Sequence, residues 1–217
     1  MKKLVFILAV ITITLLIIKR KEMTWRQSLL KTVYPFIMLK EKWFPGERSV
    51  QLNSKKIQAP VSFYTLQATA NNGAGIDFEA FRGKKVLIVN TASDCGFTAQ
   101  YDELEILHQR YKNKLIILGF PANDFKHQEK KDDTAIAAFC KINYGVSFPL
   151  MQKSHVVRGV EQNPVFEWLT NAARNGWCNQ QPLWNFSKYL VDEHGILIGF
   201  FAPTVSPLDK KVVSAIQ

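Results

Sequence analysis

Along residues 60–217, short continuous apolar runs alternate with segments in which apolar residues recur at helical spacing. This alternation predicts strands interleaved with helices. Continuous apolar runs, typical of strands buried on both faces of a sheet, occupy residues 85–92 and 115–120. Apolar residues at helical spacing predict helices over residues 98–112, 134–144, 163–173 and 207–216. Two hairpins are predicted, one joining 62–66 to 76–78 and the other joining 189–191 to 196–201. This order predicts an α/β fold with a central mixed sheet flanked by helices.

Residues 1–22 follow a different pattern. Leu4–Ile18 is an uncharged, mainly apolar run bounded on both sides by lysines. As a helix it would span about 22 Å, less than the ~30 Å hydrocarbon core of a bilayer. A secretory signal peptide and an uncleaved membrane anchor both fit. We favour the anchor, because Lys-Arg-Lys-Glu follows Ile18 where a cleavage site has small residues, and because lysines reach back to the interface.

The side of the membrane stays open, since both flanks of this run are basic. Translation starting at Met23 would instead give a cytoplasmic protein without the segment.

Residues 23–59 are predicted to be an amphipathic segment followed by a linker. Apolar residues between Trp25 and Leu39 recur mostly at helical spacing, with Pro35 as a break. A helix on the membrane surface and a helix packed on the domain fit this pattern equally well. Residues 45–60 are largely polar, so the folded domain is expected to begin near Pro60.

Composition narrows the class of protein. A chain of 217 residues, 47% hydrophobic and 21% charged, suits one globular domain with an extension. Three cysteines without a Cys-x-x-Cys pair exclude a disulfide scaffold and a zinc ribbon, and the four histidines lack metal-ligand spacing. We therefore expect no metal and no other bound cofactor. The net charge is +10, but basic residues form no arginine-rich stripe with aromatics, so nucleic-acid binding is not expected.

Cys95 is the candidate for chemistry, because it lies between a buried strand and a helix predicted to start near Thr98. Amides at a helix N-terminus favour a thiolate, and Gly96 allows a close backbone approach. A thiolate in this place is a nucleophile. The alternative is that Cys95 is a small buried hydrophobic residue.

Three segments together resemble the glutathione peroxidase family. They read NTASDCGFT at 90–98, FPANDFKHQE at 120–129 and WNFSKYLV at 184–191, and the resemblance covers about residues 60–217. It implies a thioredoxin-like fold, reduction of hydrogen peroxide or organic (lipid) hydroperoxides, and a role in the response to oxidative stress. It also implies a catalytic set of Cys95, Gln128, Trp184 and Asn185. Two amides and an indole would stabilise a thiolate without acting as a general base.

The middle segment departs from the family pattern. Ala122 and Asp124 replace a Cys and a Gln, and Lys130 and Lys131 replace Pro-Gly. An inward-pointing Asp124 would oppose thiolate formation, and the two lysines would offset it.

Cys140 resembles the resolving cysteine of thioredoxin-dependent family members, which forms a disulfide with the oxidised nucleophile. Its helix would have to unwind locally, and we expect the helix-unfriendly Asp132, Asp133 and Thr134 to ease this. The resemblance implies thioredoxin or glutathione as the reductant, and the short 173–184 stretch implies a monomer. We interpret Cys178 as an incidental, exposed thiol.

Two other functions compete with peroxidase activity. One is a redox sensor or relay that passes oxidation to a partner protein. The other is a non-catalytic thioredoxin-like scaffold tethered to a membrane, in which Cys95 would titrate as an ordinary thiol.

Overall fold

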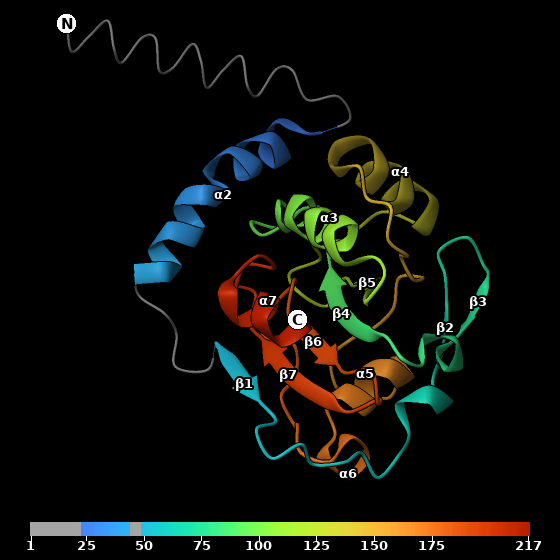
Figure 1. Ribbon diagram of the computed structural model, residues 1–217. Coiled ribbons are helices and arrows are strands. Elements are labelled where there is room, and N and C mark those ends of the chain that lie inside the picture. The colour runs from blue at the N-terminus through green and yellow to red at the C-terminus, as the bar shows by residue number, and fades with distance from the viewer. Residues whose placement is uncertain (1–22, 44–48) are drawn as a thin grey trace, which may run out of the picture.

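The computed structural model describes residues 23–43 and 49–217 and arranges them around a five-stranded mixed sheet (Figure 1). Its strand order is β1-β7-β6-β4-β5. β4 and β5 are parallel, whereas the other neighbouring strands are antiparallel. The strands are β1 (Val50–Leu52), β4 (Lys85–Thr91), β5 (Leu115–Pro121), β6 (Lys188–Val191) and β7 (Leu197–Phe201). The predicted α/β class with a mixed sheet is confirmed.

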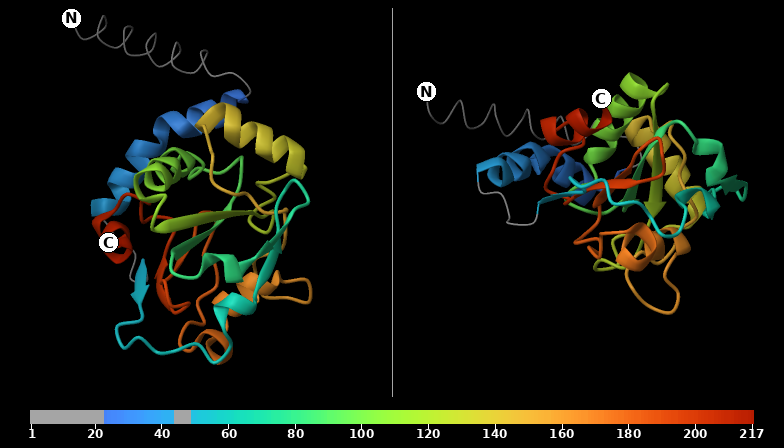
Figure 2. Two further views of the ribbon diagram at one scale, coloured as in Figure 1. Left: turned by 45° about the vertical axis from the view of Figure 1, so that its right-hand side comes forward. Right: turned by 60° about the horizontal axis from the view of Figure 1, so that its bottom comes forward.

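Helices cover both faces of the sheet, as the continuous apolar runs predict (Figure 2). Alternate residues of β4 enter different halves of the core, with Val86 and Ile88 in one half and Leu87 and Val89 in the other. The first half includes α5 (Pro164–Leu169). The second half includes α3 (Gln100–Tyr111), α4 (Asp133–Tyr144) and α7 (Lys210–Ile216).

Two predicted elements differ from the structure. The predicted helix 163–173 is split into α5 and α6 (Ala172–Asn175), because Asn171 caps the second helix through its side chain. The first predicted hairpin is formed by β2 (Gln67–Thr69) and β3 (Gly75–Asp77). Its expected first arm is instead the 3₁₀ helix η1 (Phe63–Thr65), and η2 (Phe78–Phe81) follows β3.

The long helix α2 (Trp25–Trp43) lies beside α3 and α4 (Figure 1). The expected break at Pro35 is wrong, since the helix continues through it. Packing on the domain explains its persistence: Gln27 and Tyr34 are buried, and the Tyr34 hydroxyl donates to Glu103 Oε1 on α3 at 3.0 Å. This packing offsets the backbone hydrogen bond that the proline lacks.

β1 lies within the segment that was expected to be a linker. It pairs with β7, so the central sheet begins before Pro60. The predicted membrane segment 4–18 and the start of the expected linker, up to residue 48, lie outside the described residues. In the part of the chain that the structure describes, no helix is both long and apolar enough to cross a membrane.

Candidate active site

Cys95 lies in a turn between β4 and α3, as predicted. Its Sγ accepts a hydrogen bond from the Phe97 amide at 3.4 Å, so the amide that faces the sulfur belongs to the turn and precedes α3. The Cys95 amide donates to Thr98 Oγ1 at 2.9 Å, which closes the turn. The cysteine is only 1% exposed, but Gly96 and Phe97 beside it are half-buried. The sulfur therefore lies one side-chain layer below the surface.

The structure brings the four predicted site residues together. Hydrogen bonds from Trp184 and Asn185 reach the Cys95 sulfur, and Asn185 Nδ2 also donates to Gln128 Oε1 at 3.0 Å. Gln128 and Trp184 are half-buried, whereas Asn185 is fully buried. Asn185 Oδ1 is buried and has no hydrogen-bond partner among the described residues. This oxygen is an available acceptor next to the sulfur.

Burial raises the pKa of the Cys95 thiol above its ordinary value. The Phe97 amide and the Trp184 and Asn185 side chains lower that pKa, while the negative charge of Asp94 raises it. The donors oppose the effect of burial without overcoming it, so this closed arrangement favours the thiol. The expectation that local amides would produce a thiolate is thus only partly met: the donors are present, but burial outweighs them.

A buried carboxylate, which the sequence analysis did not single out, joins two of the motifs. Glu129 is fully buried, and its two oxygens accept from the Ser93 amide and the Ser93 hydroxyl, both at 2.8 Å. The Asp94 amide donates to the Gln128 carbonyl at 3.1 Å. These bonds fix the Gln128 loop to the Cys95 loop. The only sequence signal was an acidic residue next to Gln128.

Asn90 and Lys188 hold the third motif in place, and neither was predicted to do so. Asn90 Nδ2 donates to the Trp184 carbonyl at 3.1 Å. Lys188 is fully buried, and its ammonium group donates to the Phe186 carbonyl at 2.7 Å and to Gln100 Oε1 at 2.8 Å. Burial lowers the pKa of Lys188 to about 7. The sequence signal that could have indicated a buried lysine was its position in a predicted, largely apolar strand.

Left-handed backbone conformations occur on both sides of the site. His127, just before Gln128, has φ 52°, and Phe186, just after Asn185, has φ 68°. Non-glycine residues adopt this region at a cost and keep it only where the surroundings enforce it. The bonds of Glu129, Asn90 and Lys188 supply that enforcement.

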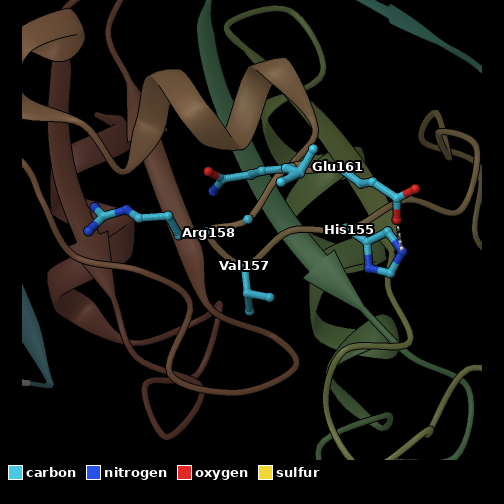
Figure 3. A pocket seen from close by; sticks show the side chains of 7 residues that line it. His155, Val157, Arg158 and Glu161 are labelled. Carbon is cyan, nitrogen blue, oxygen red and sulfur yellow. Dashed lines mark ion pairs between the residues drawn. The ribbon is translucent and has the colours of Figure 1, made fainter.

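Asp124 bonds to groups outside the four-residue site, and the negative charge that opposes thiolate formation at Cys95 is that of Asp94 instead. The Asp124 carboxylate accepts from His155 Nδ1 at 2.7 Å and from the Val156 amide at 2.8 Å. The hydrogen bond and charge of Asp124 raise the pKa of His155. His155 Nε2 also pairs with Glu161 Oε2 at 3.5 Å, and both residues line a pocket of about 360 Å³ (Figure 3). Lys131 does lie near the site, with its ammonium group 3.2 Å from Ser93 Oγ.

Cys140 projects from α4 into the same half of the core as Cys95. It is fully buried next to Tyr101, and burial raises its pKa to about 12. Asp132 does not weaken the helix as expected, because its side chain accepts from the Ala135 amide at 2.8 Å and caps α4. Cys178 was expected to be exposed, but it is 1% exposed and packs in the other half of the core. All three cysteines are free thiols.

The N-terminal helix α2 contacts the Cys95 loop directly. Gln27 Nε2 donates to the Ser93 carbonyl at 3.0 Å, and Arg26 forms an ion pair with Asp94. Farther along α2, Ile37 Cδ1 lies 3.8 Å from where a Cβ on Gly96 would stand. The helix therefore supports the loop and places a positive charge against Asp94.

The charge of Asp94 gives a testable pH dependence. The thiolate is the reactive form, so alkylation of Cys95 by iodoacetamide should still increase with pH above about 8.5, the value of an ordinary thiol. Because Asp94 raises the pKa of Cys95, Asp94→Asn should shift this pH profile to lower pH. Peptide mapping by mass spectrometry measures the rate at Cys95. Glu161→Gln removes a similar, distant charge and should leave the profile unchanged; an identical profile in both variants would refute the effect.

Comparisons with known proteins agree with this arrangement. The model of the family described as "Glutathione peroxidase" matches residues 63–170. The "Glutathione peroxidase homolog BsaA" of Staphylococcus epidermidis is 46% identical over 147 residues, which cover 67% of this chain and 92% of the relative. The "Glutathione peroxidase-like peroxiredoxin GPX5" of Chlamydomonas reinhardtii is 46% identical over 146 residues, covering 67% and 89%.

Solved structures support the same fold. The structure described as "Trgpx in apo form" is 32% identical, with a TM-score of 0.55 over 73% of this chain and 97% of that one. A DsbF homologue from Corynebacterium diphtheriae is 17% identical, with a TM-score of 0.57 over 79% of this chain and 95% of that one. This second likeness concerns the thioredoxin-like fold alone.

Proposed function

This chain belongs to the glutathione peroxidase family and is a peroxidase, and from that premise we propose that it reduces hydrogen peroxide or organic hydroperoxides at Cys95. The observation that carries the proposal is that the Trp184 and Asn185 side chains donate to the Cys95 sulfur, while Gln128 bonds to Asn185 beside them. Two neutral side-chain donors at one sulfur, with a third amide next to them, suit a reaction in which negative charge passes from sulfur to oxygen.

In the first step, the Cys95 sulfur attacks one peroxide oxygen and the O–O bond breaks. The products are a Cys95 sulfenic acid and an alcohol or water, and the thiol proton ends on the leaving oxygen. Asn185 Oδ1, which has no partner among the described residues, is placed to accept from the hydroperoxide O–H. In this proposal the Trp184 indole and the Gln128 amide donate to the departing oxygen. Because Cys95 is 1% exposed, a half-buried neighbour must move aside when peroxide enters.

In the second step, the Cys140 thiol attacks the sulfenic sulfur, which forms a disulfide and releases water. Both cysteines belong to one core cluster, and this supports the pairing. A dithiol protein of the thioredoxin type then reduces the disulfide by exchange, with glutathione as the other candidate reductant. We infer that the protein acts as a monomer in the response to oxidative stress, held at a membrane by residues 4–18, where lipid hydroperoxides form.

One equivalent of hydrogen peroxide tests this proposal on the full chain. The expected product has lost two hydrogen atoms by intact mass, and peptide mapping places a disulfide between Cys95 and Cys140. The same measurement on the untreated protein reports whether the N-terminal segment is retained. An unreactive Cys95 would favour a non-catalytic scaffold. Fast oxidation without turnover by thioredoxin or glutathione would favour a redox relay.

A further inference from the structure

Helix α2 has two contrasting faces. Its inner face packs on the domain, where Gln27 and Tyr34 are 5% and 6% exposed. Its outer face carries four apolar side chains at spacings of four, seven and three residues, which align on one side of a helix. These residues, which we call the outer stripe, are Trp25 (74% exposed), Leu29 (37%), Phe36 (72%) and Leu39 (54%).

The neighbouring sequence indicates what covers the outer stripe. The apolar run 4–18 ends seven residues before Trp25, a distance of at most about 25 Å in an extended chain. If this run enters a bilayer, α2 must begin close to the lipid headgroups. Residues 19–43 also contain seven basic and two acidic residues. Arg26 and Lys31 pair with Asp94 and Asp102 of the domain, and the remaining five basic residues against two acidic ones still favour an anionic surface. Tryptophan at the start of α2 is the residue type that prefers such an interface.

We propose that α2 lies along an anionic lipid surface through the outer stripe, an inference that rests on the proposed membrane attachment of residues 4–18. Gln27 on the inner face and the neighbouring, exposed Arg26 contact Ser93 and Asp94, the two residues before Cys95. The bilayer thereby fixes the orientation of the whole domain, with the Cys95 loop directly behind the lipid-bound helix. The helix then packs on the domain with one face and on the membrane with the other. The two interpretations of this segment, a helix on the membrane surface and a helix packed on the domain, are therefore compatible.

Tryptophan quenching by brominated lipid tests the contact. The full chain is reconstituted into phosphatidylcholine–phosphatidylglycerol vesicles with or without bromine on the acyl chains, and all proteins carry Trp43→Phe to remove a second indole of α2. Brominated lipid should quench the parent protein, and most of this quenching should be lost in Trp25→Phe. Trp177→Phe is the matched control, since Trp177 follows α6 at the opposite end of the domain (Figure 1), and it should retain the quenching.

A second pair of variants separates the helix face from the anchor. Phe36→Asp places a charge on the outer stripe and should reduce the quenching of Trp25. Ile57→Asp changes an exposed apolar residue elsewhere and should not. Equal quenching in Phe36→Asp and the parent would overturn the proposal, because the anchor alone would then bring Trp25 to the lipid.

Absence of quenching in the parent would also overturn it and would mean that another protein segment covers the stripe. Peroxide consumption is measured on the same samples. A protein that no longer consumes peroxide would count against the proposed enzyme reaction. The lipid contact is tested separately, by the quenching alone.

Discussion

Cys95→Ser is expected to lower the rate of hydroperoxide reduction by about 10³-fold or more, because a neutral hydroxyl is a far weaker nucleophile towards peroxide oxygen than a thiolate. The surrounding donors remain in this variant. Asn185 still donates to Gln128, and the Glu129–Ser93 bonds are unaffected. The loss therefore reports on the sulfur itself. Peroxide-dependent oxidation of thioredoxin, followed at saturating thioredoxin, is the measurement.

Cys178→Ser is the matched control for Cys95→Ser. Both thiols are 1% exposed, but Cys178 packs in the half of the core on the other side of the sheet. This variant should keep the activity of the parent protein. An undiminished rate in Cys95→Ser would show that the nucleophile is another group.

Cys140→Ser is expected to separate the first turnover from continued turnover. The sulfenic acid should form at an unchanged rate, because the side chain that bonds the Cys140 thiol is Tyr101 rather than Gln128, Trp184 or Asn185. Thioredoxin-driven turnover should be lost, since no internal disulfide can form. Stopped-flow measurement of a single turnover and a steady-state thioredoxin assay give the two rates.

Folding effects can be separated from chemistry at this position. Cys140 is fully buried, so a serine hydroxyl there costs stability, whereas Cys140→Ala places no polar group in the core. Both variants should lose thioredoxin-driven turnover. If either variant retained it, Cys140 would not be the resolving cysteine. Any unwinding of α4 from its start during disulfide formation would work against the cap from Asp132, which is worth about 1 kcal/mol.

Local sequence patterns predicted the central strands and helices and indicated Cys95 as the candidate nucleophile. The apolar runs that became β4 and β5 are recognisable because both faces of these strands are covered. Cys95 was recognisable because a reactive cysteine between a strand and a helix is a local arrangement. Gln128, Trp184 and Asn185 followed from family resemblance, and their convergence required the structure.

The supporting groups could not be predicted because their partners are distant in sequence. Glu129 bonds Ser93 across 36 residues, and Lys188 bonds Gln100 across 88. From sequence alone, a glutamate and a lysine are predicted to lie on the surface. Their burial becomes possible only because the fold brings hydrogen-bond donors or acceptors to them. The direction in which the pKa of Cys95 shifts could not be predicted for the same reason, since it depends on how deeply the fold buries the sulfur.

The position of α2 limits the directions from which a large molecule can reach the nucleophile. Arg26 and Gln27 occupy the flank formed by Ser93 and Asp94, while Trp184 and the Phe125 ring, whose centroids lie 5.4 Å apart, form another. A hydroperoxide group is small enough to enter between such side chains. A folded reductant is not, so under the proposed mechanism we expect it to dock over the aromatic flank once the Cys95–Cys140 disulfide has become accessible. The position of α2 would then let size as well as chemistry separate a hydroperoxide from its protein reductant.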